Sequence, residues 1–340
     1  MKKPSILLIY TGGTIGMMED VRSKSLKPFD FKHLTKQIPE LKKLNIELSA
    51  IAFDKPIDSS DMNPGVWIKL AGLIEENYSK HDGFVLLHGS DTMAYTASAL
   101  SFMLENLNKP VILTGSQLPL GIIRTDGKEN LITAIEIAAE RKNGKPVVPE
   151  VCIYFEYQLY RGNRTHKYNA EHFQAFQSAN YPILAEAGVH IKFNYNAIRK
   201  VNNKKLVVHT KLDSDIAILK IFPGISKSVV ESVLAARHLK AVVLETFGAG
   251  NGPTDTWFVE LLKNAIKRGV VIYNVTQCNA GAVEQGKYET STQLKKIGVI
   301  GGADITYEAA IAKLMFLLGQ NSSLKDIPRL LTSSLRGELT

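Results

Sequence analysis

The chain has 340 residues, of which 45% are apolar and 22% charged, and its net charge is +8. This length is too great for one small core and suits two α/β domains. The composition is that of an ordinary globular protein, and no apolar run approaches the roughly 18 residues of a membrane span. We therefore expect a protein without a membrane partner.

The N-terminus and the cysteines both argue against export. The apolar run Ile6–Tyr10, behind Lys2 and Lys3, is shorter than the roughly 7–15 residues of a signal-peptide core, and it enters a Gly-Gly turn directly. Cys152 and Cys278 cannot form a disulfide framework, and neither lies in a zinc-type spacing. We expect a cytoplasmic protein, because a reducing compartment fits this cysteine usage best.

The positive charge raises the question of nucleic acid. The densest basic stretch runs from Arg199 to Lys205, and no aromatic stacking pattern surrounds it. Such charge runs usually face water, so we interpret this one as a solvated linker and expect no nucleic-acid partner. A mild positive charge would also help to attract anionic substrates.

The N-terminal half alternates buried-type strands with helical patterns. The segments Ser5–Tyr10, Gly83–Leu87 and Val111–Thr114 each end in a polar loop that contains glycine, and Thr92–Asn106 and Lys128–Arg141 have helical spacing. This alternation predicts a parallel sheet flanked by helices. Because ligands bind at the carboxyl ends of such strands, the three polar loops are expected to converge on one site.

The character of the chain changes over Ile191–Asp213, which is rich in Asn and Lys and which we interpret as a linker containing a short hairpin. A second α/β pattern follows, with strands at Ile216–Ile221, Ala241–Leu244 and Val270–Asn274 and a helix at Ser226–His238. The sequence thus predicts a larger N-terminal domain with a parallel-rich sheet and a smaller C-terminal α/β domain. The expected boundaries are 1–190 for the domain carrying the catalytic residues, 191–213 for the linker and 214–340 for the C-terminal domain.

The first polar loop reads TGGTIG over residues 11–16. Its glycines allow positive φ and would leave Thr14 on a tight turn beside backbone N–H groups, which suits an oxyanion. By itself the loop fits a phosphate cradle, a plain structural turn or a hydroxyl nucleophile. It is neither a GxGxxG fingerprint nor a P-loop.

The second polar loop adds chemistry at a strand end. His88-Gly89-Ser90-Asp91-Thr92 offers two hydroxyls and a carboxylate in consecutive positions. Asp91 also suits a helix N-cap, so the loop read in isolation has a purely structural explanation as well.

Motifs along the whole chain resemble those of the asparaginase–glutaminase family, in particular its cytoplasmic type I branch. TGGTIG at 11–16 and GFVLLHGSDTMAYTASAL at 83–100 resemble its two signature motifs. Shorter matching segments, in the same order as in the family, are LTGSQLPL at 113–120, DGKENL at 126–131, YRGNRTHK at 160–167, TQC at 276–278, GVIGGADIT at 298–306 and LRGELT at 335–340. Together these segments make a chance agreement implausible.

The resemblance implies specific site residues. Thr14 matches the primary nucleophile, and Ser90, Asp91 and Lys167 match a hydroxyl–carboxylate–lysine triad. The segment Asp58-Ser59-Ser60 matches the one that holds the α-carboxylate of the substrate, and Asp91 would hold the α-ammonium. Outside this resemblance, Lys167 would be taken as an exposed lysine and Asp58 as part of a polar turn before a helix. No metal and no cofactor are implied.

The chain departs from the family pattern at two places. Ser90 stands where the family usually has Thr, which keeps the hydroxyl and loses a methyl group that restricts χ1. Met17–Asp30 contains no tyrosine, although many relatives use one there to assist the nucleophile, and Leu26 stands near the expected position. Tyr288 is our candidate replacement, with surface packing as the alternative. The segment Met17–Asp30 still suits a lid hinged at Gly16.

Some cytoplasmic relatives have a second, regulatory asparagine site, and Thr165 and Cys278 fall in the segments that match it. Glu245, however, stands where such relatives present an arginine to the effector carboxylate. A carboxylate there would repel the effector, which argues against this regulation. The alternative for Cys278 is a small buried side chain.

The family resemblance predicts an amidohydrolase that splits L-asparagine into L-aspartate and ammonia through an acyl-enzyme, as a homodimer or homotetramer. The amidase subunit of a tRNA-dependent amidotransferase shares the fold but typically has an extra domain before the TGGT loop. A non-catalytic amino-acid sensor would keep Asp58, Ser59 and Asp91 but need not keep Thr14 and Lys167 together. A nucleotide-binding protein would need a ribose-binding acid, which does not stand at the expected distance after the loop.

Overall fold

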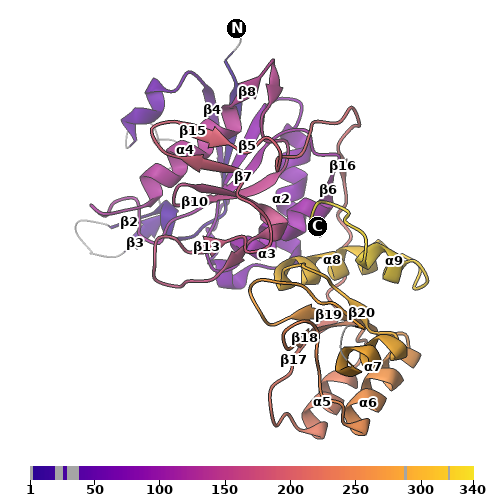
Figure 1. Cartoon of the computed structure of the whole chain (residues 1–340). Coiled ribbons are helices and arrows are strands. Elements are labelled where there is room, and N and C mark those ends of the chain that lie inside the picture. Colours follow the sequence, from indigo (N-terminus) through magenta and orange to yellow (C-terminus); the bar gives the residue numbers. More distant parts are fainter. Residues whose placement is uncertain (1–2, 20–25, 29–37, 287–288, 321) are drawn as a thin grey trace. The chain divides into compact units, whose positions relative to one another are not determined.

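The computed structural model describes residues 3–19, 26–28, 38–286, 289–320 and 322–340, in which the chain forms two compact units (Figure 1). Unit 1 consists of Met1–Ser178 and Pro182–Thr210, and unit 2 of Ala179–Tyr181 and Lys211–Thr340. Both units are α/β, and the predicted fold class is confirmed. Among the described residues, no helix is both long enough and apolar enough to cross a bilayer.

Unit 1 is built on an eight-stranded sheet in the described part of the chain, with the strand order β15-β14-β11-β10-β7-β5-β1-β4. The strands from β4 to β10 pair in parallel, whereas β10, β11, β14 and β15 pair in antiparallel fashion. The central strands are continuous apolar runs because both faces of a parallel sheet are covered. The strands are β1 (Ser5–Tyr10), β4 (Glu47–Ala52), β5 (Gly83–Leu87), β7 (Val111–Thr114), β10 (Val151–Phe155), β11 (Gln158–Arg161), β14 (Ala185–Ala187) and β15 (Ile191–Phe193).

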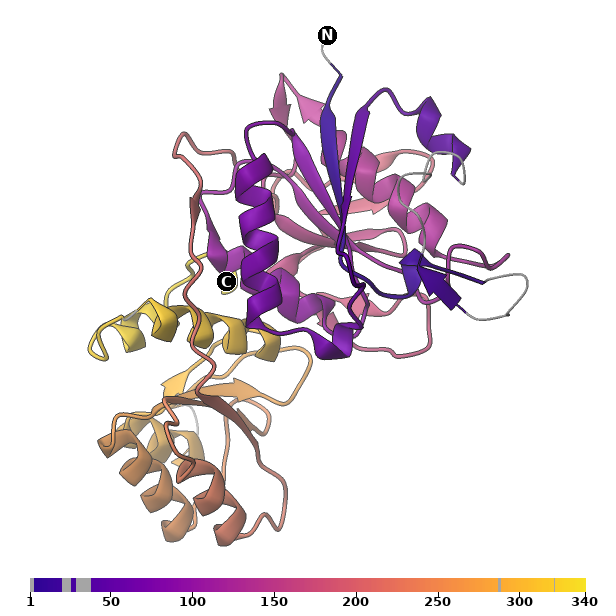
Figure 2. The ribbon, with the colours of Figure 1, turned by 180° about the vertical axis from the view of Figure 1, so that it is seen from behind.

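Three helices cover this sheet: α2 (Pro64–Asn77), α3 (Met93–Met103) and α4 (Gly127–Ala139). Seen from behind, α2 lies in front of the sheet and α4 lies on its far side (Figure 2). The start of α2 is fixed by sequence, because the Asn63 side chain accepts hydrogen bonds from two backbone N–H groups and Pro64 occupies the first turn. The residues of α3 are nearly all buried, which makes it a core helix.

Short elements complete unit 1. The strand pairs are β2 (Met17–Glu19) with β3 (Leu26–Pro28), β6 (Leu104–Glu105) with β16 (Val207–Val208), β8 (Arg141–Lys142) with β9 (Lys145–Pro146), and β12 (His166–Lys167) with β13 (Phe176–Gln177). The 3-10 turns are η1 (Thr14–Gly16), η3 (Pro39–Lys43), η4 (Ser59–Asp61) and η5 (Gly162–Arg164). The hairpin expected within 191–213 is not formed, because β15 pairs with β14 and β16 pairs with β6.

Unit 2 contains a parallel four-stranded sheet in its described residues, with the order β17-β18-β19-β20. Its strands are β17 (Ile216–Lys220), β18 (Ala241–Thr246), β19 (Val271–Thr276) and β20 (Ile300–Gly301), and its helices are α5 (Lys227–Leu234), α6 (Thr256–Lys267), α7 (Glu289–Ile297), α8 (Tyr307–Gly319) and α9 (Ile327–Leu331). Ser226 and Thr306 cap α5 and α8 through their hydroxyls. The chain end is tied to α8, because the buried Lys313 amine lies 2.6 Å from the buried Glu338 carboxylate.

In unit 1, the loops that follow β1 and β5 meet the turn containing Ser59 at the place where Gly13 lies against Gly89. Gly13 has φ 85° and ψ 169°, a conformation that essentially only glycine adopts. A Cβ on Gly13 would lie 2.5 Å from the Gly89 nitrogen, and a Cβ on Gly89 would lie 2.5 Å from Ser59 Oγ. The loops can therefore approach this closely only because neither glycine has a side chain.

We expect Gly13→Ala to destabilise unit 1 by more than the roughly 1–3 kcal/mol that such backbone strain costs, because the new methyl group also meets the Gly89 backbone. Gly144→Ala is the matched control, since Gly144 also has a positive φ of 76° but an added Cβ there meets no atom within 4 Å. Calorimetric melting should show the larger loss for Gly13→Ala. Equal losses would mean that the contact with Gly89 does not constrain the loops.

Candidate active site

The first loop is fastened by its backbone to both neighbouring segments. Thr11 N donates a hydrogen bond to Leu87 O at 3.0 Å, and Ile57 N donates to Thr11 O at 2.8 Å. Thr14 lies three residues further on, at the start of η1, and is half-buried. The predicted nucleophile is thus on a turn braced against the end of β5.

Lys167 joins Ser90 and Asp91 in one cluster. Its Nζ lies 2.8 Å from Ser90 Oγ and 2.6 Å from Asp91 Oδ1. The Lys167 side chain is 14% exposed, whereas the Asp91 side chain is 68% exposed. The cluster therefore shields the amine and presents the carboxylate to solvent.

The segment before Lys167 is anchored in the core of unit 1. The buried Arg161 guanidinium lies 2.6 Å from the Glu150 carboxylate, and this ion pair is desolvated on both sides. Thr165 is fully buried, and its hydroxyl donates to Arg161 O at 2.7 Å. Thr165, which the family resemblance assigns to a regulatory site, thus uses its hydroxyl within this turn.

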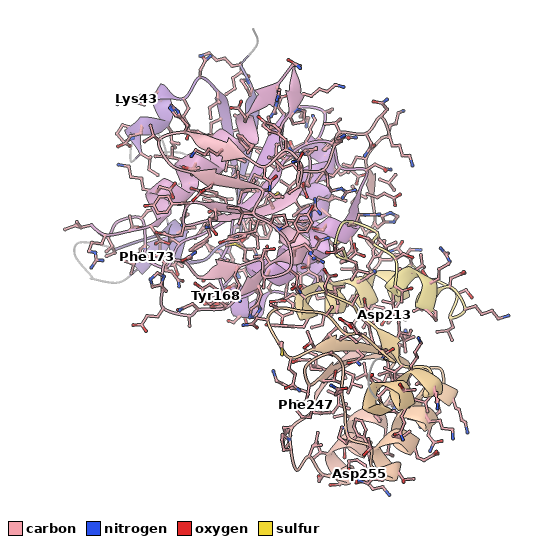
Figure 3. All side chains as sticks on the ribbon, viewed as in Figure 1. Lys43, Tyr168, Phe173, Asp213, Phe247 and Asp255 are labelled. Atoms are coloured by element: carbon pink, nitrogen blue, oxygen red, sulfur yellow. The ribbon has the colours of Figure 1, made fainter. Side chains whose placement is uncertain are left out.

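Gln117 is a site neighbour that our sequence reasoning missed. Ser90 Oγ donates to Gln117 Oε1 at 3.3 Å, while Gln117 Nε2 donates to the carbonyls of Ala170 and His172. These two carbonyls fix the amide orientation, because only the Nε2 end can donate. They belong to the loop whose Tyr168 and Phe173 are labelled in Figure 3. The sequence did offer one indication of this role, because Gln117 lies just after the strand Val111–Thr114, whose polar loop was expected to face the site.

The hydrogen bonds around Ser90 have a defined direction. Since Ser90 gives its proton to Gln117, Lys167 must donate to Ser90 Oγ, and Lys167 also donates to Asp91. Lys167 is thus the donor in both of these hydrogen bonds. Transfer of the Ser90 proton to Lys167 would require this pattern to reverse.

Asp58, Ser59 and Ser60 form the turn that precedes α2. Both the backbone N–H and the hydroxyl of Ser60 donate to Asp58 Oδ1, and the backbone bond is the main reason that the pKa of the Asp58 carboxyl lies below its ordinary value. Ser59 is buried, and Ser59 O accepts a hydrogen bond from Thr92 Oγ1 at 2.7 Å. The turn is therefore tied to the loop that carries Ser90 and Asp91.

Cys278 and Glu245, which bear on the regulatory site of some relatives, lie in unit 2. Cys278 is exposed, so the alternative of a small buried side chain is wrong, and its N–H donates to Thr276 Oγ1. Glu245 is largely buried and pairs with Lys220 at 3.1 Å. The Glu245 carboxylate is thus paired with the ammonium of Lys220.

Tyr288 lies outside the described residues. The segment Met17–Asp30 is described only at β2 and β3, where Leu26 pairs with Glu19. Within the described ranges, no group of three or more His, Cys, Asp or Glu side chains is placed to hold a metal ion.

Comparisons with known proteins identify the family of the chain. Residues 5–199 match the family model "Asparaginase, N-terminal", and residues 215–331 match "Glutaminase/Asparaginase C-terminal domain". L-asparaginase 1 of Escherichia coli K12 is 44% identical to this chain, in an alignment that covers 100% of this chain and 99% of the relative. The 60 kDa lysophospholipase of Mus musculus is 42% identical, in an alignment that covers 98% of this chain and 62% of the relative. L-asparaginase I of Vibrio cholerae is 41% identical and matches with a TM-score of 0.89 over the full length of both chains. The chain therefore belongs to the asparaginase family of amidohydrolases.

Proposed function

We propose that this protein is an L-asparaginase, which hydrolyses L-asparagine to L-aspartate and ammonia through an acyl-enzyme on Thr14. The observation that carries the proposal is the Lys167 bridge, in which one amine contacts both Ser90 and Asp91. The loop that holds this pair abuts the Thr14 loop at Gly89. A nucleophile, a proton-transfer group and a carboxylate for a substrate ammonium therefore lie on adjoining loops.

The proposed reaction has two half-reactions. Thr14 Oγ1 forms a bond to the side-chain amide carbon of asparagine, and the hydroxyl proton passes to a base. The C–N bond of the tetrahedral intermediate then breaks, and the nitrogen leaves as ammonia after taking up a proton. Water attacks the resulting ester, the C–O bond to Thr14 breaks, and aspartate leaves while Thr14 regains its proton.

The role proposed for Lys167 depends on Asp91. The Asp91 carboxylate accepts a hydrogen bond from the Lys167 amine, which also donates to Ser90. The α-ammonium of bound asparagine would compete for the exposed Asp91 carboxylate. This competition would weaken the hold on Lys167, so that its neutral amine could turn its lone pair toward Ser90 Oγ and accept the Ser90 proton.

Substrate recognition follows from the same charges. Asp91 would receive the α-ammonium, and the turn Asp58–Ser60 would receive the α-carboxylate. Because both Ser60 donors are engaged by Asp58, carboxylate binding would turn the Ser60 hydroxyl from Asp58 to the substrate. The length of the substrate side chain is a weaker discriminator, since one methylene changes binding by only about 1–3 kcal/mol.

We further propose that Tyr288 assists Thr14 in place of the tyrosine missing from Met17–Asp30. The protein is proposed to act in the cytoplasm as a homodimer or homotetramer. The cysteine usage supports the cytoplasmic location. The oligomeric state is proposed because the sharing of sites between subunits is common in the family.

The direct test of the function is ammonia release measured over a range of asparagine and glutamine concentrations. We expect turnover of asparagine, and the ratio of kcat/KM values would give the preference between the two amides. A sigmoidal response would reveal an effector site. No ammonia from asparagine at any concentration would refute the proposed function.

Thr14→Ala is expected to abolish ammonia release, because no oxygen remains to form the ester, while asparagine still binds in calorimetric titrations. Thr14→Ser is the matched control, since it keeps the hydroxyl and should retain measurable turnover. Undiminished turnover by Thr14→Ala would remove Thr14 from the role of nucleophile.

Lys167→Met should lower kcat at least about 10²-fold, because it removes the proton-transfer group while keeping a long apolar stem. The exposed Lys80 provides the control, and Lys80→Met should have the kcat of the unmodified enzyme. Steady-state kinetics distinguish the cases, since a change confined to KM would mean that Lys167 only binds substrate.

Tyr288→Phe should lower kcat with little change in KM, because the phenol would act on the hydroxyl of Thr14 and not on the substrate. Tyr195→Phe, at a half-exposed tyrosine whose ring lies under Lys142, is the control for loss of a phenol elsewhere. If the two variants have equal kcat values, Tyr288 is a surface residue without a catalytic role.

A further inference from the structure

His88 lies at the centre of the loops that form the site. It follows β5 directly and is fully buried. Its backbone N–H donates to Thr114 O at 2.9 Å, and a Cβ on Gly115 would lie 2.4 Å from His88 O. The main chain of His88 is thus enclosed by the end of β7 on one side, while its next residue, Gly89, touches Gly13 and Ser59 on the other.

The His88 side chain takes part in a directional hydrogen-bond chain. Nδ1 lies 2.6 Å from Gly89 O, which can only accept, so Nδ1 carries the proton. Nε2 must then accept from Thr96 Oγ1 at 2.9 Å, and Thr96 Oγ1 in turn accepts from Trp67 Nε1 at 2.9 Å. The chain therefore runs from α2 through α3 to the loop that carries Ser90.

The protonation state of the ring agrees with this direction. Burial lowers the pKa of His88 to about 4, so the imidazole is neutral at neutral pH. A neutral ring has one donor and one acceptor, which is what Gly89 O and the Thr96 hydroxyl require. Every polar atom in the chain from Trp67 to Gly89 O is thereby matched.

The hydrogen bond from His88 to Gly89 O also constrains the main chain of Ser90. The peptide bond between Gly89 and Ser90 is planar, so fixing the direction of Gly89 O also fixes the Ser90 N–H and the Ser90 Cα. The preceding peptide, between His88 and Gly89, lies against Gly13, one residue before Thr14, and the two peptides share the Gly89 Cα. One ring nitrogen thus restrains the position of Ser90 relative to the Thr14 loop.

We propose that His88, held by Thr96 and Trp67, is a positioning residue that aligns Ser90 and the Thr14 loop for amide hydrolysis. It acts through the Gly89 carbonyl and does not touch the substrate. The proposal rests on the function proposed above and adds to it residues outside the family-matched site set. An apolar side chain would fill the same buried space without the cost of burying imidazole and hydroxyl groups, which argues that this chain of hydrogen bonds serves alignment.

The test uses Thr96, because truncating His88 itself risks misfolding. Thr96→Val keeps the shape and removes the hydroxyl, whereas Thr96→Ser keeps the hydroxyl. Thr133→Val is the matched control: Thr133 is a buried helical threonine of the same unit, and its hydroxyl bonds Glu129 on α4, away from His88. Melting temperature, kcat and KM are measured for all three variants.

We expect Thr96→Val to lower kcat between about 10- and 100-fold with less than about a twofold change in KM, since small misplacements of reacting groups have effects of this size. Thr96→Ser should retain most of the kcat, and Thr133→Val should lose stability without losing kcat. A Thr96→Val enzyme with lowered melting temperature and unchanged kcat would overturn the proposal, because His88 would then have only a structural role.

Histidine-selective ¹⁵N NMR separates this proposal from the proposed function, because it needs no turnover. At neutral pH the His88 ring should carry its proton on Nδ1, and Thr96→Val should change the Nε2 resonance more than Thr96→Ser does. A proton on Nε2 would overturn the positioning chain even in an active enzyme. If the native protein released no ammonia from asparagine, the proposed function would fail while this NMR result stood.

Discussion

The contact between Gly13 and Gly89 is the constraint on which the site depends. Two main chains touch there with no side chain between them, at the carboxyl ends of the neighbouring parallel strands β1 and β5. Thr14 and Ser90 each follow one of these glycines directly in the sequence. The parallel pairing of two strands and the absence of two Cβ atoms therefore bring together hydroxyls that are distant in the chain.

Around this contact, buried groups hold the loops in place, and more exposed groups are available to contact a substrate. The buried pair of Arg161 with Glu150 anchors the segment that leads to Lys167, and the buried ring of His88 bonds the carbonyl of Gly89, which precedes Ser90. The groups nearer to solvent, above all the Asp91 carboxylate, remain free to exchange partners with a substrate. The mechanism proposed above, in which the hydrogen bonds at Ser90 reverse during turnover, needs this combination of rigid support and exchangeable charge.

The sheet and its polar loops could be predicted because Ser5–Tyr10 and Gly83–Leu87 are unbroken apolar runs that end in glycine-containing loops. The bond between Lys167 and Ser90 spans 77 positions and could not be deduced from spacing, so it was expected only through the family resemblance. Gln117 was missed because its amide is oriented by loop carbonyls more than fifty positions away. Cys278 was expected to be buried from the general behaviour of cysteine, and in this chain its loop leaves it exposed.

The central claim is that the ester forms on Thr14 and that Ser90 transfers protons. Rapid acid quenching of the enzyme during turnover of asparagine, followed by peptide mass spectrometry, tests it most directly, because the two hydroxyls lie on different peptides. We predict an aspartyl ester on the peptide that contains Thr14. An ester on the peptide that contains Ser90, with none on Thr14, would contradict the account.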